Sequence, residues 1–300
     1  MLETGLIAVG IDGSQAALVA ARWAAADAQR RGSTLRLVHA LAQPTVGGYP
    51  EPSLLAPQVN DQMRSRAARL LETTAALLTT EHPGLGIETA QQDGRPAEVL
   101  MAESSRAIAT VVGPDGVGRL SGAFFGSVAA RLAAHGHGCI VIARPDPEVT
   151  SASDHGVVVV GVDGSDEAQA AIGFAYEEAA LRGSTLVAIN TWNDKPLNHA
   201  LGNYPLDINA DGIDQAEHRL LETELAGWEQ KYPEVPVRMR ILRGRPAPNL
   251  LRYAAATGDH PSQLIVVGSR GRGGFAGLLL GSTSQAVVAH ASCSVAVVHR

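Results

Sequence analysis

Glycine and hydroxyl residues between positions 268 and 284 have the types and spacing that could bind a phosphate group. Residues 264–267, Leu-Ile-Val-Val, form a short β-branched run that predicts a buried strand. Five glycines follow within ten positions, too many for the interior of a helix. A Gly-Ser-Thr-Ser segment then leads into residues 285–291, which have helical composition. A strand, a glycine loop and a helix N-terminus in this order let backbone N–H groups and hydroxyls converge on an anion.

The same pattern occurs twice in the chain. Two residues separate the first two glycines, and nine precede a Gly-Ser pair, in both Gly113, Gly116, Gly126-Ser127 and Gly268, Gly271, Gly281-Ser282. A single copy would be read equally well as a set of turns. Two matched copies, each with an aspartate at the end of an earlier strand, indicate nucleotide binding.

Other segments recur as well, so the chain consists of two homologous halves. Residues 6–14 return as 158–165, residues 31–35 as 182–186, and residues 94–97 as 244–247. A proline-rich polar stretch, residues 144–155, separates the halves. We expect two domains, residues 1–145 and 154–300.

Strands and helices alternate within each half. In the first half we predict strands at 6–11, 35–40, 87–91, 108–112 and 140–143. Helices are predicted at 14–31, with Ser14 as N-cap and Gly32 past its end, at 59–80, from Pro96, and at 127–134. This alternation predicts an α/β fold of two tandem Rossmann-like domains. Each is a five-stranded, mainly parallel sheet with helices on both faces.

Asp12 and Asp163 follow the first strand of each half. Ligands of open α/β sheets bind at the carboxyl ends of the strands, where the strand order reverses. If the first and fourth strands are neighbours, each aspartate shares a crevice with a glycine loop. The alternative is that both are only turn formers or helix caps, because Asp-Gly-Ser is ordinary turn chemistry.

The composition narrows the functional class. The chain has 300 residues, 45% of them hydrophobic, and a net charge of −6, which argues against a general nucleic-acid binder. Cys139 and Cys293 lack CxxC spacing and are expected to be ordinary buried thiols. No signal peptide and no membrane-spanning run is evident, so we expect a soluble cytoplasmic protein without a membrane partner.

Together these residues resemble the universal stress protein family in its tandem two-domain form, over almost the whole chain. The ATP-binding members of that family carry the G-2x-G-9x-G-S/T spacing described above. The resemblance implies the strand order 3-2-1-4-5 and binding of ATP, with Mg or Mn left open as an accompanying ion. It also implies pairing through the last strands, a homodimer, and a regulatory role in stress response or growth control with an unidentified protein partner.

The resemblance also assigns site residues. It places Asp12 and Asp163 near the adenine and ribose, and Ala40 and Thr191 in the turn after the second strand, contacting adenine through the backbone. The predicted nucleotide-binding residues of the first half are Asp12, Gly13, Ala40, Gly113, Gly116, Gly118, Gly126, Ser127 and Val128. Those of the second half are Asp163, Gly164, Thr191, Gly268, Arg270, Gly271, Arg272, Gly273, Gly281, Ser282 and Thr283.

The two halves differ where phosphates would lie. Arg270 and Arg272 of the second loop correspond to Asp115 and Val117 of the first. Pro114, which has no N–H group, replaces the serine of the second loop. We therefore expect weaker binding in the first half.

Other polar residues have simpler interpretations. His135 and His290, near helix ends, are expected to cap or pack rather than catalyse. Arg95 and its counterpart in the second half mark a strand–helix junction, with contact to a ligand as the alternative. Two long loops, 43–57 and 193–211, are candidate lids over the adenine site.

Three functions stay open at this point. The first is an ATP-binding regulatory or sensor module. The second is a slow ATPase or nucleotide-dependent transferase, but no general base recurs in both halves, so no catalytic residue is predicted. The third is an interaction scaffold with one degenerate nucleotide site.

Overall fold

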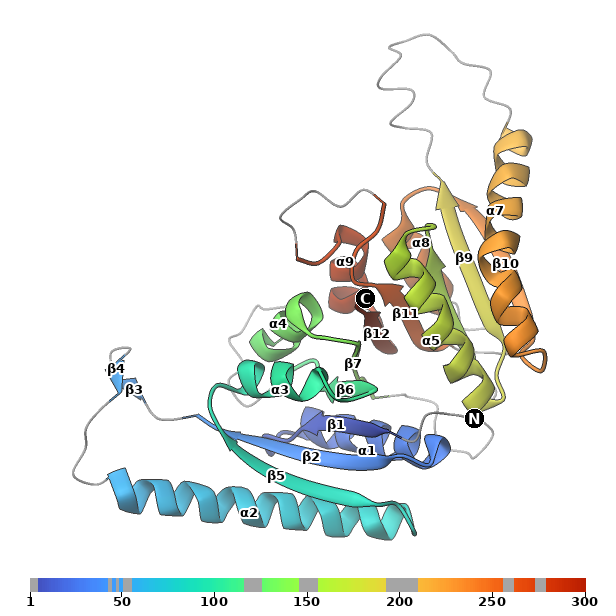
Figure 1. The fold of residues 1–300 in the computed structure, drawn as a ribbon. Coiled ribbons are helices and arrows are strands. Elements are labelled where there is room, and N and C mark those ends of the chain that lie inside the picture. Colours follow the sequence, from blue (N-terminus) through green and yellow to red (C-terminus); the bar gives the residue numbers. More distant parts are fainter. Residues whose placement is uncertain are drawn as a thin grey trace. The chain divides into compact units, whose positions relative to one another are not determined.

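The computed structural model describes residues 5–42, 45–46, 49–50, 56–115, 126–145, 156–192, 210–255, 262–272 and 279–300. The chain divides into two compact units, Met1–Pro145 and Asp146–Arg300. Each unit is described by itself, and both have the same plan of alternating strands and helices (Figure 1).

The described residues of the first unit form a five-stranded sheet, four helices and a short hairpin. Its elements are β1 (Leu6–Gly10), α1 (Gln15–Arg31), β2 (Thr34–Leu41), the hairpin β3 (Thr45–Val46) and β4 (Tyr49–Pro50), α2 (Ala56–Glu81), β5 (Ile87–Asp93), α3 (Pro96–Ser104), β6 (Ala109–Val112), α4 (Ser127–His135) and β7 (Cys139–Ile142).

The second unit repeats this order without a described hairpin. Its elements are β8 (Val157–Val162), α5 (Asp166–Arg182), β9 (Leu186–Trp192), α7 (Ala210–Lys231), β10 (Val237–Arg243), α8 (Pro246–Ala255), β11 (Ser262–Gly268), α9 (Ser282–His290) and β12 (Ser294–Val298).

All strand pairs within the two five-stranded sheets are parallel. The order is β5-β2-β1-β6-β7 in the first unit and β10-β9-β8-β11-β12 in the second. In both units this is the order 3-2-1-4-5, so the predicted fold class is confirmed. The first three strands are added toward one edge of the sheet and the last two toward the other edge. The point between the first and fourth strands is therefore the switch point at which ligands of such sheets bind.

Helices cover both faces of each sheet. In the first unit α1 and α2 lie on one face, and α3 and α4 lie together on the other (Figure 1). In the second unit α5 packs beside α7, and α8 packs beside α9. This arrangement follows from right-handed crossovers, which put the first two helices and the last two on opposite faces.

Helix ends explain most of the predicted boundaries. Ser14 and Ser165 are the N-caps of α1 and α5, and each side chain accepts from a backbone N–H three residues on. Gly32 and Gly183 end these helices at φ 64° and 60°, a left-handed conformation in which glycine has no steric penalty. Residues 282–284, predicted to precede the last helix, belong to α9. Gly281 itself is the N-cap residue, without a side-chain hydrogen bond, so the helix begins at Ser282.

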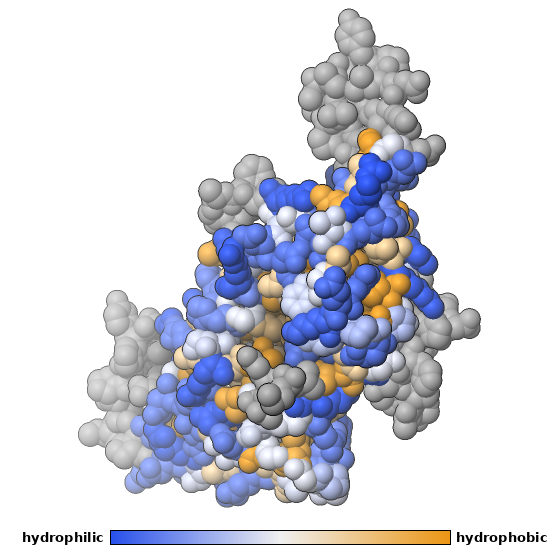
Figure 2. All heavy atoms as spheres, turned by 45° about the vertical axis from the view of Figure 1, so that its right-hand side comes forward, coloured by the Kyte–Doolittle hydropathy of each residue, from blue (hydrophilic) through white to orange (hydrophobic). Residues whose placement is uncertain are grey.

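The core consists of the apolar strands and the alanine-rich face of α1. Both cysteines are buried, as expected. Hydrophilic residues predominate on the face drawn in Figure 2. Among the described residues, Val59 and Leu279 are the exposed large hydrophobic side chains. No helix in the described part of the chain is long and apolar enough to cross a membrane.

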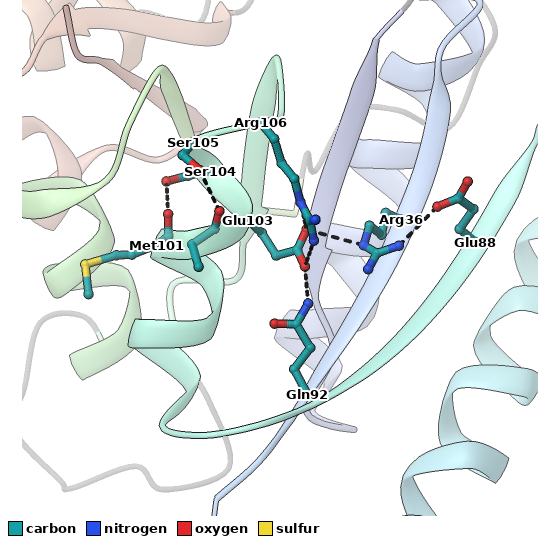
Figure 3. A network of polar contacts seen from close by, with 9 residues as sticks. Arg36, Glu88, Gln92, Met101, Glu103, Ser104, Ser105 and Arg106 are labelled. Carbon is teal, nitrogen blue, oxygen red and sulfur yellow. Dashed lines mark hydrogen bonds and ion pairs between the residues drawn. The ribbon is translucent and has the colours of Figure 1, made fainter.

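A buried carboxylate connects α3 to the sheet of the first unit (Figure 3). Glu103 is fully buried, and its Oε2 lies 3.3 Å from Arg36 Nε of β2 and accepts from Arg106 Nε at 3.0 Å. Gln92 of β5 also donates to Glu103. Arg36 Nη1 in turn donates to Glu88 Oε2 at 3.1 Å. The hydrogen bond that Arg106 donates to the Glu103 carboxylate raises the pKa of the Arg106 guanidinium. One side chain of α3 thus holds two strands and its own helix end.

The Glu103→Ala variant should lower the free energy of unfolding by about 3 kcal/mol, because it leaves the shielded Arg36 without its buried counter-ion. The Arg106→Ala variant should lose less than about 1 kcal/mol, since that side chain is 55% exposed. Urea unfolding followed by circular dichroism measures both. Equal losses would contradict the assignment of Glu103 as the buried centre of the network.

Candidate phosphate-binding site

Parallel pairing brings each strand-end aspartate beside a glycine loop. β1 pairs with β6, with Val9 opposite Val111, and β8 pairs with β11, with Val160 opposite Val266. Asp12 and Asp163 follow β1 and β8, while the glycine loops follow β6 and β11. The adjacency on which the sequence interpretation depended is therefore present in both units.

The carboxylate of Asp163 joins the two chain segments of the second crevice. Its Oδ1 accepts from Ser165 N at 3.0 Å and from Ser165 Oγ at 2.6 Å. Its Oδ2 accepts from Arg272 N at 3.0 Å, across 109 positions of sequence. Asp163 is thus a turn former, as the alternative reading held, and also fixes the position of the glycine loop.

Two glycines are required by this contact. A Cβ atom on Gly271 would overlap Asp163 Oδ2, and one on Gly164 would overlap the Arg272 guanidinium. Gly164 also has φ 72°, which disfavours any larger residue. The glycines therefore let the loop lie directly against the turn after β8.

The first glycine of each loop lets a helix start approach closely. A Cβ on Gly268 would lie 3.0 Å from backbone atoms of Glu167, the second residue of α5. A Cβ on Gly113 would lie 2.8 Å from the same atoms of Ala16, the second residue of α1. Glu167 and Ala16 thus occupy matching positions at the two sites.

The N-terminus of α9 faces the same loop. Gly281 is its N-cap at φ −66° and donates from its N–H to Ser269 O at 2.8 Å. Ser284 Oγ donates to Gly268 O at 2.6 Å, which ties the helix to the end of β11. Ser282 and Thr283 are the first two helical residues, and N–H groups in a first turn have no acceptor within the helix. Such a terminus favours an anion.

Charged side chains surround this helix end. Arg270 Nη2 lies 3.3 Å from Glu167 Oε1, and the Arg272 side chain covers Gly164. Asp166, the first residue of α5, pairs with Arg300. The two arginines were predicted from the sequence, but the acidic residues were not. The signal available for them was the Asp-Glu pair directly after Asp-Gly-Ser.

The first unit keeps the framework of the site. Asp12 Oδ1 accepts from Ser14 N at 2.9 Å, and Gly13 has φ 84°. Gly126 is the N-cap of α4 and donates to Pro114 O at 2.6 Å, as Gly281 does to Ser269. Ser127 and Val128 begin α4. The predicted site residues Gly116, Gly118 and Gly273 lie outside the described residues.

Two details of the sequence interpretation need correction. The N–H of Ser269 donates to Val298 O at 2.8 Å, so its replacement by Pro114 removes a strand-end hydrogen bond and not a phosphate donor. Ala40 and Thr191 are the penultimate residues of β2 and β9 rather than members of the following turns. β2 extends one residue beyond the predicted strand 35–40 at each end.

Two matching polar residues near the ends of β2 and β9 have partners within their own units. His39 Nδ1 lies 2.7 Å from Ile11 O, whereas the matching Asn190 donates to Glu217 at 2.7 Å. His135 and His290 are the last residues of α4 and α9. Arg95 is the N-cap residue of α3. Most of the two candidate lids, 43–57 and 193–211, lies outside the described residues.

Comparison with known proteins decides the family. A family model described as the universal stress protein family matches residues 5–144 and 156–299. The chain belongs to the universal stress protein family.

Relatives of this universal stress protein share its whole length. It is 35% identical over 294 residues to the universal stress protein Rv2623 of Mycobacterium tuberculosis, covering 97% of this chain and 95% of that one. It is 35% identical over 298 residues to Rv1996 of the same organism, covering 94% and 91%. The crystal structure of a universal stress protein from Archaeoglobus fulgidus superposes with a TM-score of 0.74 at 20% identity, over 99% of both chains. That last likeness supports the tandem fold.

The Gly271→Ala variant should break the contact between loop and turn, because the new methyl group displaces the Asp163 carboxylate. We expect the Arg272 amide to exchange with solvent at least about tenfold faster, with little change in melting temperature, because loop openings are local. Hydrogen exchange measured by mass spectrometry or NMR tests this.

Gly227→Ala is the matched control, since nothing lies within 4 Å of a Cβ at that position of α7. Its Arg272 exchange rate should equal that of the unmodified chain. An unchanged rate in Gly271→Ala would show that Asp163 does not anchor the loop.

Proposed function

We propose that this universal stress protein binds ATP or another adenine nucleotide and acts as a regulatory module. The supporting observation is the second crevice, where Asp163 accepts from the glycine loop and Gly281, the N-cap of α9, donates to the same loop. The matched glycine spacing in both units and membership in the family agree with it. Binding would change the conformation or the partner affinity of the protein, which is the response expected of a sensor in stress or growth control.

The donors at the second site fit a polyphosphate. The N–H groups of the first turn of α9 point toward an anion bound at that end, and Arg270 and Arg272 supply positive charge on the adjoining loop. In the described part of the chain, no group of three or more His, Cys, Asp or Glu residues could hold a metal ion.

The second unit has an aromatic side chain next to the residue predicted to contact adenine. Trp192, the last residue of β9, donates from Nε1 to Asp214 of α7 at 2.5 Å. The Arg243 guanidinium lies 5.5 Å from the centre of its ring. Trp192 directly follows Thr191, which the family resemblance assigns to adenine. Its fluorescence offers a local report of nucleotide binding.

The Gly281→Glu variant should reduce ATP affinity at the second site by at least about tenfold while the chain stays folded. A glutamate there would bring negative charge to the phosphate position. The fold should tolerate it, because φ is −66° and the nearest atoms to a Cβ lie 3.4 Å away. Calorimetric titration beside thermal melting measures both effects.

The matched control is Gly227→Glu, which adds the same charge at an exposed position of α7. This variant should bind ATP with unchanged affinity. Absence of heat or saturation with ATP, ADP and AMP at millimolar levels in the unmodified chain would refute nucleotide binding altogether.

The second site should bind more tightly than the first by roughly tenfold, since Asp115 stands where the second loop has Arg270. Titration of the Gly126→Glu variant with ATP measures the affinity of the second site alone. Titration of the Gly281→Glu variant measures the affinity of the first site alone. Equal residual affinities would rule out the asymmetry and the third hypothesis, a scaffold with one degenerate site.

We also propose a homodimer, as the family resemblance implies. The resemblance places the pairing at the last strand of each domain, which is β7 in the first unit and β12 in the second. Sedimentation equilibrium across a wide concentration range should show the dimer, and a monomer throughout would exclude it.

A further inference from the structure

The second site contains an acidic side chain that competes with a phosphate for the loop cation. Glu167 Oε1 lies 3.3 Å from Arg270 Nη2. The Glu167 side chain is only 18% exposed, whereas that of Arg270 is 56% exposed. The arginine is thus the movable partner, and the carboxylate is held by the start of α5.

The position of Glu167 follows from the packing of the loop. Gly268 has no side chain, so the backbone of Glu167 lies against the end of β11. Gly281 lies on the other side, with the Cα atom of Arg270 3.4 Å from where its Cβ would be. Arg270 therefore stands between the carboxylate of Glu167 and the N-terminus of α9.

The first unit has an alanine in place of this glutamate. The residue in the matching position is Ala16, which contacts Gly113 through the same backbone atoms. The glutamate is therefore not needed to build the loop. Its own benefit is a favourable interaction with the N-terminal dipole of α5.

We propose that Glu167 sets the phosphate selectivity of the second site by holding Arg270 until a nucleotide displaces it. This inference rests on the proposed nucleotide binding. Each additional phosphate brings negative charge that attracts Arg270 and is repelled by Glu167. Because both effects grow with the number of phosphates, Glu167 lowers the affinity for ATP more than the affinity for AMP and so reduces the preference for ATP.

The size of the effect follows from the exposure of the pair. Half-exposed ion pairs contribute little to stability, and a tenfold change in affinity corresponds to about 1.4 kcal/mol. Removing the carboxylate should tighten ATP binding about threefold to tenfold. It should tighten AMP binding less than twofold, so the preference of the second site for ATP over AMP should rise.

The test is calorimetric titration of the full chain carrying Gly126→Glu, so that binding reports the second site. Glu167→Gln keeps the size of the side chain, and Glu167→Ala restores the residue of the first unit. Both should gain affinity for ATP more than for AMP, with at most a small fall in melting temperature. In an Arg270→Ala background the gain from Glu167→Gln should shrink.

Asp166→Asn is the matched control, because it removes the same charge from the preceding residue, whose partner is Arg300. It should leave the ratio of ATP to AMP affinity unchanged. Unchanged or weaker ATP binding in folded Glu167 variants, or an equal gain in Asp166→Asn, would overturn this role of Glu167 alone. No nucleotide binding by the reference chain would overturn the proposed function and this inference together.

Discussion

The hydrogen bond from the Arg272 amide to Asp163 is the contact on which the second site depends. It joins the turn after β8 to the loop after β11, which are distant in sequence and meet because the first and fourth strands are neighbours. Without it, a loop containing five glycines between 268 and 277 would have few constraints on its backbone. With this hydrogen bond, the start of the loop lies against α5 and the N-terminus of α9. The N–H groups of that helix end and the loop arginines then lie around the proposed phosphate position.

The same framework carries different electrostatics in the two units. Close backbone approach at Gly113 and Gly268, and glycine N-caps before α4 and α9, are shared. The charged groups are not, because Glu167 and Arg270 stand where the first unit has Ala16 and Asp115. Duplication thus preserved the geometry that depends on glycine, while the residues that adjust anion affinity diverged.

The sequence predicted what depends on local patterns and repetition. Alternating apolar runs and Ser and Gly caps located the strands and helices, and the family resemblance supplied their order. Side-chain partners were harder, because they depend on how closely elements approach. The Glu167–Arg270 pair requires Gly268 to admit the start of α5, and the Ser269 donor is used by Val298, at the end of the neighbouring strand. Neither contact leaves a periodic signal, and Ala40 and Thr191 lie within strands that continue beyond their β-branched residues.

Residue-resolved NMR of the isotopically labelled chain during ATP titration would locate the bound phosphates. We expect the amide signals of Arg272, Ser282 and Thr283 to shift saturably and together, because phosphate oxygens bind at the N-terminus of α9 beside the Asp163 contact. Saturable shifts elsewhere, with these three amides unchanged, would place the nucleotide at another site and contradict the account.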